Sequence, residues 1–255
     1  MSETSVLDID IGNTRLKWCL RSAQSGAVYG ACNDSERSGQ LAKLEEAMAA
    51  HNASPSRVRV ASVASDASNA TLSLLLQRTF SIAPEMAKTG EECRGLRNSY
   101  TEPAHMGVDR WLAMLAAREL LPSRNATALC VVDAGSALTL DFVAPNGSHE
   151  GGYILPGRRM QIDALLSNTG RVFADPEPGC VSIEPANSTS DAVHRGVLAS
   201  MAFTIEGACG AFLAQYPDAA IYMGGGDAAR LQPLLSLELI DAPNLVLDGL
   251  PLLLP

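Results

Sequence analysis

The chain has 255 residues, a formal net charge of −9, 47% hydrophobic residues and 18% charged residues. This amount of apolar material supports a substantial core and argues against an intrinsically disordered chain. The length suits one large domain or two modest ones. An acidic chain without a cluster of Lys and Arg is a poor candidate for binding nucleic-acid phosphates or anionic lipid, so neither nucleic acid nor a membrane is an expected partner.

The start of the chain and its cysteines indicate a cytoplasmic protein. The segment MSETSVLDID lacks the basic stretch followed by an apolar stretch that marks a secretory signal. No run of about 18 uncharged apolar residues occurs, so no membrane-spanning helix is expected. The six cysteines are scattered, without a CxxC pair or a matching histidine spacing, which disfavours a zinc site or a disulfide framework.

The first half of the chain opens with a tight glycine turn between two strand-like runs. Residues 6–20 predict strand, turn at Gly12, strand. After a linker-like stretch, the pattern predicts a helix over 40–50, a strand over 57–63, a helix over 70–80, an irregular segment, and a strongly periodic helix over 108–121. A long irregular segment inside a compact domain is more often a binding element than filler.

After a polar break at residues 123–125 the same pattern restarts. Residues 129–143 again predict strand, glycine turn, strand. A glycine-bounded apolar segment (GGYILPG, 151–157), one long helix (192–216) and a short buried strand (219–223) that runs into GGGD (224–227) follow. A further helix and an apolar end complete the chain.

One short motif occurs twice, about half a chain apart. Residues 10–17 (DIGNTRLK) and 133–140 (DAGSALTL) share the scheme Asp-x-Gly-small polar-small, each between two strand-like runs. A single copy would be explained most simply as an ordinary turn, since Asp and Gly favour turns. Two copies at this spacing instead predict two lobes of like topology, over residues 1–122 and 123–255.

Both turns have the composition of a phosphate-binding site. Glycine beside a small polar residue lets backbone N–H groups approach phosphate oxygens, and Thr14 and Ser136 add a hydroxyl donor. The carboxylate of Asp10 or Asp133 would repel a neighbouring phosphate unless a cation lies between the carboxylate and the phosphate. Lys17 can supply positive charge while the phosphoryl group moves. Because no Walker A motif and no GxGxxG after a strand occur, P-loop and Rossmann folds are disfavoured, which leaves the two-lobed actin-like ATPase.

A second group of polar residues lies at the start of the helix over 108–121. Gly107 releases the chain into this helix, so Asp109 and Arg110 lie in its first turn. An acid there also interacts favourably with the helix dipole, which is a purely structural alternative. As functional residues, Asp109 would take a proton from an acceptor hydroxyl during in-line phosphoryl transfer, and Arg110 would hold a carboxylate or phosphate.

In this combination and order, the sequence resembles the type III pantothenate kinases. The landmarks are DIGNT (10–14), Tyr100, GVDR (107–110), DAGSALTLD (133–141), GGYILPG (151–157), STSDAVHRG (188–196) and GGGD (224–227), which together cover nearly the whole chain. The resemblance implies an α/β fold of two ribonuclease-H-like lobes, with mixed sheets flanked by helices, as in a duplicated actin-like ATPase. It also implies ATP-dependent phosphorylation of pantothenate to 4'-phosphopantothenate, the first step of coenzyme A biosynthesis.

The resemblance also assigns roles to individual residues. It makes Asp109 the catalytic base and Asp133 the ligand of a monovalent cation, K⁺ or NH₄⁺, while Mg²⁺ accompanies ATP. The implied ATP contacts are Asp10, Ile11, Gly12, Asn13, Thr14, Arg15, Leu16, Lys17 and Ser136. The implied pantothenate contacts are Tyr100, Gly107, Val108, Asp109, Arg110 and Thr189, the last from the other subunit of a homodimer. The family commonly has Thr at the position of Ser136, which keeps the hydroxyl but lacks the methyl group.

Two alternatives remain open at this point. Another small-molecule kinase or phosphohydrolase on the same frame would be separated by a substrate panel with ATP, since a pantothenate kinase should ignore sugars and acetate. A regulatory protein that kept the fold and lost the chemistry, acting as an accessory factor for transcription, is disfavoured by the presence of Asp10, Asp109, Arg110 and Asp133.

A few other residues are expected to be structural. Trp18 and Trp111 lie on apolar periodic positions and predict core side chains. Arg158 and Arg159 are expected to be a solvated pair, and His194 a surface or interface group. The glycines at 224–226 are expected to let an adenine or ribose approach the backbone.

Overall fold

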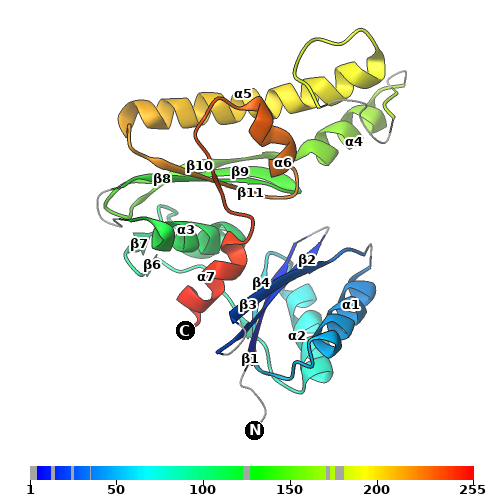
Figure 1. Cartoon of the computed structure of the whole chain (residues 1–255), viewed down its shortest axis with the longest axis vertical. Helices are drawn as coiled ribbons and strands as arrows, with labels where there is room; N and C mark the ends of the chain where they lie inside the picture. The colour runs from blue at the N-terminus through cyan, green and yellow to red at the C-terminus, as the bar shows by residue number, and fades with distance from the viewer. Residues whose placement is uncertain are drawn as a thin grey trace. The chain divides into compact units, whose positions relative to one another are not determined.

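The computed structural model describes residues 5–12, 15–23, 26–34, 36–122, 127–170, 173–175 and 181–255. These residues form two compact units (Figure 1). The first unit contains residues 1–94, 100–116 and 244–255, and the second contains residues 95–99 and 117–243. One of the boundaries between them falls inside a helix, α3 (Val108–Leu120).

The first unit is built on a five-stranded mixed sheet. In sequence its strands are β1 (Ser5–Ile11), β2 (Leu16–Ser22), β3 (Gly26–Cys32), β4 (Pro55–Ser62) and β5 (Glu85–Met86), and in space they follow the order β3-β2-β1-β4-β5. The first three strands are antiparallel neighbours, whereas β4 and β5 are added in parallel. Helices α1 (Arg37–Ala50) and α2 (Asp66–Phe80) are the long connections of the unit.

Alternation along β1 explains why the first sheet is covered on both faces. Leu7 and Ile9 point into a core that includes Leu44 of α1 and Leu76 of α2. On the other face, Cys19 and Ala61 of the sheet belong to a second cluster with residues of α3 and α7 (Leu245–Leu253). The strand therefore lies between two helical layers.

The second unit repeats this architecture. Its strands are β8 (Leu129–Ala134), β9 (Ala137–Val143), β10 (His149–Pro156), β11 (Ala220–Gly224) and β12 (Ile240–Asp241), arranged in the order β10-β9-β8-β11-β12. The same pattern recurs, with three antiparallel strands followed by two parallel additions. The predicted duplication is thus confirmed, because both sheets place their third, second, first, fourth and fifth strands in the same spatial order.

Helices cover the second sheet through a large apolar core. They are α4 (Arg158–Asn168), α5 (Thr189–Gln215) and the short α6 (Ala228–Leu231), followed by η2 (Gln232–Leu234). Among the described residues, α5 is the helix that is long and apolar enough to cross a membrane by length and composition alone. One of its faces, with Val197, Met201 and Ile205, packs against β8 and β9 in the core of the unit (Figure 1).

The remaining elements join or complete the two units. They are the strands β6 (Glu92–Cys93) and β7 (Leu96–Arg97), the turn η1 (Pro103–His105), and helices α3 and α7. The last helix belongs to the first unit, although the sequence placed residues 123–255 together in one lobe. Its Leu247 and Leu250 are buried, and Gly249 lies directly on the backbone of Leu112, a contact that any side chain would prevent.

Two local expectations were wrong. The linker-like stretch after Leu20 contains the edge strand β3, whose mostly exposed residues give no apolar alternation to read. His194, expected at the surface, is 3% exposed, and its Nε2 lies 2.7 Å from the carbonyl oxygen of Asp175. Trp18 and Trp111 are core residues, as predicted.

Candidate active site

The first glycine turn joins β1 to β2. The Gly12 N–H donates to the Arg15 carbonyl over 3.1 Å, and a Cβ at Gly12 would lie 3.3 Å from that oxygen. Asp10 and Lys17 are register partners across the hairpin, so their opposite charges share one face of the sheet. Asn13 and Thr14 lie outside the described residues.

The neighbouring residues of this turn divide into core and surface. Ile11 and Leu16 are almost completely buried, so their side chains pack in the core and only their backbone is left for a ligand. Sequence reasoning missed Arg37, whose Nη2 donates to the Gly12 carbonyl over 3.2 Å. Burial lowers the pKa of the Arg37 guanidinium, which nevertheless stays charged near neutral pH. Arg37 therefore brings a positive charge to the turn.

The start of α3 brings several of the predicted substrate residues together. The backbone N–H of Arg110 donates to Oδ1 of Asp109 over 2.7 Å, which fixes this carboxylate at the helix N-terminus. Arg110 is buried; its Nη1 donates to the Tyr100 hydroxyl over 2.9 Å, and its guanidinium lies 5.8 Å from the centre of the Tyr100 ring. Asp109 itself is partly exposed.

Two residues at this helix start act through backbone rather than side chain. Gly107 is the residue whose carbonyl accepts the first helical hydrogen bond, from Trp111. A Cβ on Gly107 would lie 2.6 Å from Oδ1 of Asp109, so a side chain there would collide with the carboxylate. Val108 is 7% exposed and packs in the core of the first unit. The glycine thus makes room for the acid.

The second glycine turn joins β8 to β9 and is surrounded by two further glycine segments. The Gly157 N–H donates to the Ser136 carbonyl over 3.1 Å, and Gly157 packs directly on the backbone of Gly135. Gly225 has φ +98°, and a Cβ on it would lie 2.5 Å from Oδ1 of Asp133. The segments GGYILPG and GGGD therefore converge on Asp133 and Ser136, of which the serine is exposed.

An ion pair next to this turn was not predicted. Arg158, expected to be solvated, donates from Nε to Oδ1 of Asp227 over 3.1 Å, and only 18% of each side chain is exposed. The Asp227 N–H in turn donates to the Ala134 carbonyl over 2.9 Å. Arg159 remains mostly exposed, as expected. A guanidinium is therefore held two residues after Pro156, beside the second turn.

Thr189 is the first residue of α5. The preceding Ser188 caps the helix, because its hydroxyl accepts from the Asp191 N–H over 3.2 Å. Thr189 is exposed. Within the described part of the chain, no three His, Cys, Asp or Glu residues are grouped closely enough to hold a metal ion by themselves. A cation at Asp133 would therefore need oxygen atoms from backbone, water or nucleotide as well.

Comparison with known proteins identifies the family. The family model of the type III pantothenate kinases matches residues 6–211. A type III pantothenate kinase of Pseudomonas aeruginosa (strain LESB58) is 33% identical over 98% of this chain and 99% of its own length. The chain belongs to the type III pantothenate kinase family. This kinase transfers phosphate from ATP to pantothenate in coenzyme A biosynthesis, and the regulatory alternative is not favoured.

Solved structures agree with the fold of this kinase. A putative 2-dehydro-3-deoxygalactonokinase from Sinorhizobium meliloti has a TM-score of 0.62 at 14% identity and covers 96% of this chain and 94% of its own. MreB 5 of Spiroplasma citri, solved with AMPPNP, has a TM-score of 0.51 at 10% identity, covering 98% of this chain and 95% of its own. The predicted actin-like fold of mixed sheets flanked by helices is thus confirmed.

Proposed function

We propose that Asp109 is the general base of the kinase and that Arg110 and Tyr100 bind pantothenate. The carrying observation is their arrangement at the start of α3, where a partly exposed carboxylate is fixed by a backbone N–H and stands beside a buried guanidinium. The dipole of α3 favours the ionised form of an acid in its first turn, which is the form that accepts a proton. The planar fork of Arg110 suits the carboxylate of pantothenate.

The proposed reaction uses these residues as follows. The primary hydroxyl of pantothenate gives its proton to the Asp109 carboxylate while its oxygen attacks the γ-phosphorus of ATP in line. The bond between the γ-phosphorus and the bridging oxygen breaks, and that oxygen leaves with ADP. Lys17 and Arg37 both lie at the first glycine turn, where positive charge stabilises the transferred group.

The two glycine turns are proposed to hold the nucleotide. The first turn, residues 10–17, contributes backbone N–H groups and polar side chains, whereas Ile11 and Leu16 contribute backbone only because their side chains are buried. The exposed Ser136 adds its hydroxyl at the second turn. Gly157 and Gly225 let the two glycine segments pack directly on this turn, and Arg158 adds a cation beside it.

Cation binding is proposed at Asp133, with Mg²⁺ accompanying ATP. The Asp133 carboxylate lies close to the backbone of Gly135 and Gly225, so a hard oxygen donor is present beside the second turn. When bound, K⁺ or NH₄⁺ supplies positive charge beside the polyphosphate. Asp133 would hold it with an oxygen atom, and Ser136 would orient the phosphate nearby.

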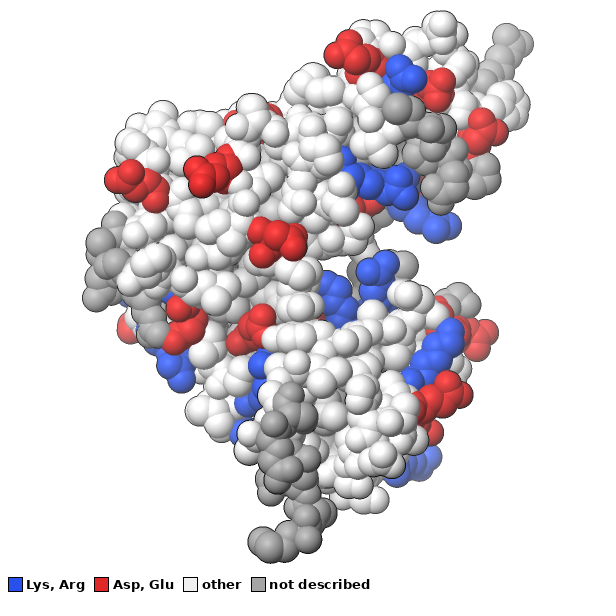
Figure 2. Space-filling model, in the orientation of Figure 1, with Lys and Arg blue, Asp and Glu red and all other residues white. Residues whose placement is uncertain are grey.

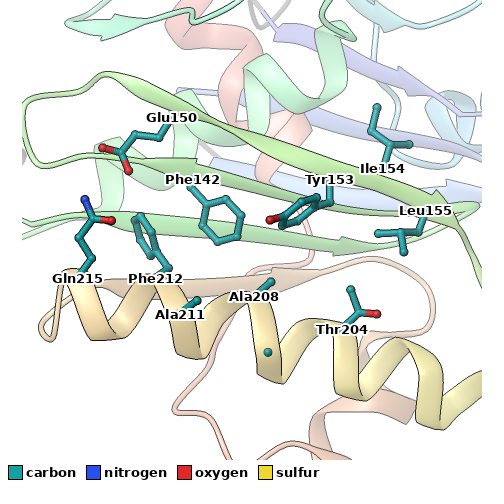
Figure 3. A pocket seen from close by; sticks show the side chains of 11 residues that line it. Phe142, Glu150, Tyr153, Ile154, Leu155, Thr204, Ala208, Ala211, Phe212 and Gln215 are labelled. Atoms are coloured by element: carbon teal, nitrogen blue, oxygen red, sulfur yellow. The ribbon is translucent and has the colours of Figure 1, made fainter.

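A homodimer is proposed through the outer face of α5 and β10. Phe203 of α5 is 63% exposed, and Tyr153 of β10 is 55% exposed. These elements border a groove of about 550 Å³, in which Phe142, Tyr153 and Phe212 lie between strand and helix (Figure 3). In Figure 2 most of the surface in the region of α5 is uncharged, with separate Asp and Glu side chains distributed over it. Exposed apolar surface of this kind is typical of a protein interface, and Thr189 at the start of α5 would then reach a neighbouring subunit's site.

We further place the kinase in the cytoplasm, without a nucleic-acid partner. Its named relatives are enzymes of metabolism, and its net charge of −9 opposes binding to a phosphate backbone.

The decisive experiment measures ATP-dependent phosphorylation of pantothenate by the Asp109→Asn variant. The rate of ADP release is the readout. Turnover should fall by roughly 10²–10⁴, the usual contribution of a positioned general base, while circular dichroism stays that of the wild type. Glu102→Gln is the matched control, since Glu102 is an acid of the same region with 72% of its side chain exposed, and it should keep full activity. Wild-type turnover in Asp109→Asn would remove Asp109 from the base role.

A further inference from the structure

A buried hydrogen-bonded chain lies outside the residues assigned above. The Nε2 of His149 lies 3.0 Å from Oδ1 of Asp141, and the Nδ1 of His149 lies 2.8 Å from the hydroxyl of Ser99. The side chains of His149 and Asp141 are 0% and 2% exposed, whereas Ser99 is exposed. A hydrogen-bonded chain thus connects a buried carboxylate, through a buried imidazole, to a serine on the surface.

The direction of the two hydrogen bonds follows from the chemistry of the groups. An ionised carboxylate only accepts, so Nε2 of His149 carries the proton that it shares with Asp141. In a neutral imidazole, Nδ1 is then an acceptor, and the Ser99 hydroxyl donates to it. The neutral tautomer of His149 that donates to Asp141 is thus the one that accepts from Ser99. This order also differs from a serine nucleophile's, in which the serine bonds Nε2 and the acid bonds Nδ1.

The segment held by this chain is short and leads to a proposed substrate residue. Residues 95–99 belong to the second unit, and Tyr100 is the first residue of the following segment in the first unit. The Arg97 N–H donates to the Gly147 carbonyl over 2.8 Å, and Nη2 of Arg97 donates to the Ser148 hydroxyl over 2.9 Å. Ser99 is thus the last side chain anchored before the chain reaches Tyr100.

Burying a polar pair costs desolvation free energy. Replacing a buried ionic or polar pair by packed apolar residues is often neutral or stabilising, so burial of the His149–Asp141 pair does not by itself account for its presence. Here the pair contacts a surface serine instead of stopping inside the core. Ser99 directly precedes Tyr100 in the chain, and Tyr100 receives a hydrogen bond from Arg110.

We propose that Ser99, His149 and Asp141 are positioning residues for pantothenate binding: they fix the backbone just before Tyr100 and thereby hold the Tyr100–Arg110 pair in its binding geometry. This inference rests on the proposed role of Tyr100 and Arg110 and adds three residues that act through them. None of the three touches the reacting atoms. Losing the anchor should therefore weaken pantothenate binding and leave ATP binding alone.

Steady-state kinetics of Ser99→Ala tests the proposal, because this exposed position is tolerant of the change. One hydrogen bond of about 0.5–1.5 kcal/mol corresponds to a rise of roughly 2- to 10-fold in KM for pantothenate. The KM for ATP and the melting temperature should stay at wild-type values. Ser99→Thr keeps the hydroxyl and should restore KM. Ser236→Ala, which removes another exposed serine hydroxyl of the second unit, should change nothing.

A double mutant separates this proposal from a local structural role. In His149→Asn, adding Ser99→Ala should raise KM for pantothenate no further, since the anchor is already lost. An unchanged KM for pantothenate in Ser99→Ala, or equal changes in both KM values, overturns the positioning role even if His149→Asn fails to fold. If Arg110→Lys also leaves KM for pantothenate unchanged, the proposed role of Arg110 in pantothenate binding is wrong. If Arg110→Lys raises it while Ser99→Ala does not, only the positioning role is lost.

Discussion

The substitution Gly107→Ala addresses the catalytic geometry without touching a charged group. A Cβ at this position would lie 2.6 Å from Oδ1 of Asp109, whereas ordinary contacts begin at 3.4 Å. The carboxylate or the start of α3 must therefore move by roughly 0.8 Å, and misplacement of a catalytic group by about 1 Å can cost about 10²-fold in rate. We expect turnover to fall roughly 10- to 100-fold.

The fold should survive this change, so the loss is specific to catalysis. Gly107 does not have a positive φ, and replacing glycine by alanine at a helix N-cap costs about 1 kcal/mol or less. The measurement is ADP release at saturating pantothenate and ATP, with thermal unfolding beside it. Gly90→Ala is the matched control, because a Cβ at Gly90 meets nothing within 4 Å. Equal turnover in both variants would show that Asp109 does not need its present position.

Three more outcomes are expected. Asp8→Asn removes a fully buried carboxylate that bonds Arg59 and Arg21 at 2.6 and 2.7 Å, so the free energy of unfolding should fall by about 3–5 kcal/mol in chemical denaturation. Asp163→Asn, in an exposed pair, should cost less than about 1 kcal/mol, and similar losses in both would refute the argument. Replacing K⁺ or NH₄⁺ by Na⁺ in the assay should lower activity, and equal rates in the two buffers count against a cation at Asp133. Phe203→Glu should shift the kinase to monomer in light scattering, while an unchanged mass argues against the α5 face as the interface.

Patterns of short range were read correctly from the sequence. Each glycine turn lies between runs of alternating apolar residues, so strand, turn and strand are specified within about 15 residues. The periodicity of α3 fixes where Asp109 and Arg110 stand on the helix, because residues one turn apart share a face. The repeated Asp-x-Gly scheme predicted two lobes of like topology, and both units contain a sheet with the same strand order.

Pairings of long range were decided by the tertiary structure. Strand β3 has no alternation because it is an edge strand whose residues are mostly exposed. The sequence of the apolar C-terminal segment does not indicate which residues it contacts. In the structure, α7 belongs to the first unit and packs there through Leu247, Leu250 and the close contact at Gly249.

The polar contacts between segments that are distant in sequence were also decided by the tertiary structure. A single sequence shows a serine, a histidine and an aspartate, or an arginine and an aspartate, but hydrogen bonds depend on distance and angle in space. Ser99, His149 and Asp141 meet because residues 95–99 lie against the start of β10, and Arg158 meets Asp227 because two glycine segments converge on one turn. The sequence by itself therefore determined the family, the two hairpins around the glycine turns, the helix that carries Asp109 and the candidate catalytic residues. Folding determined which distant side chains support them, because only packing brings separate segments within hydrogen-bonding distance.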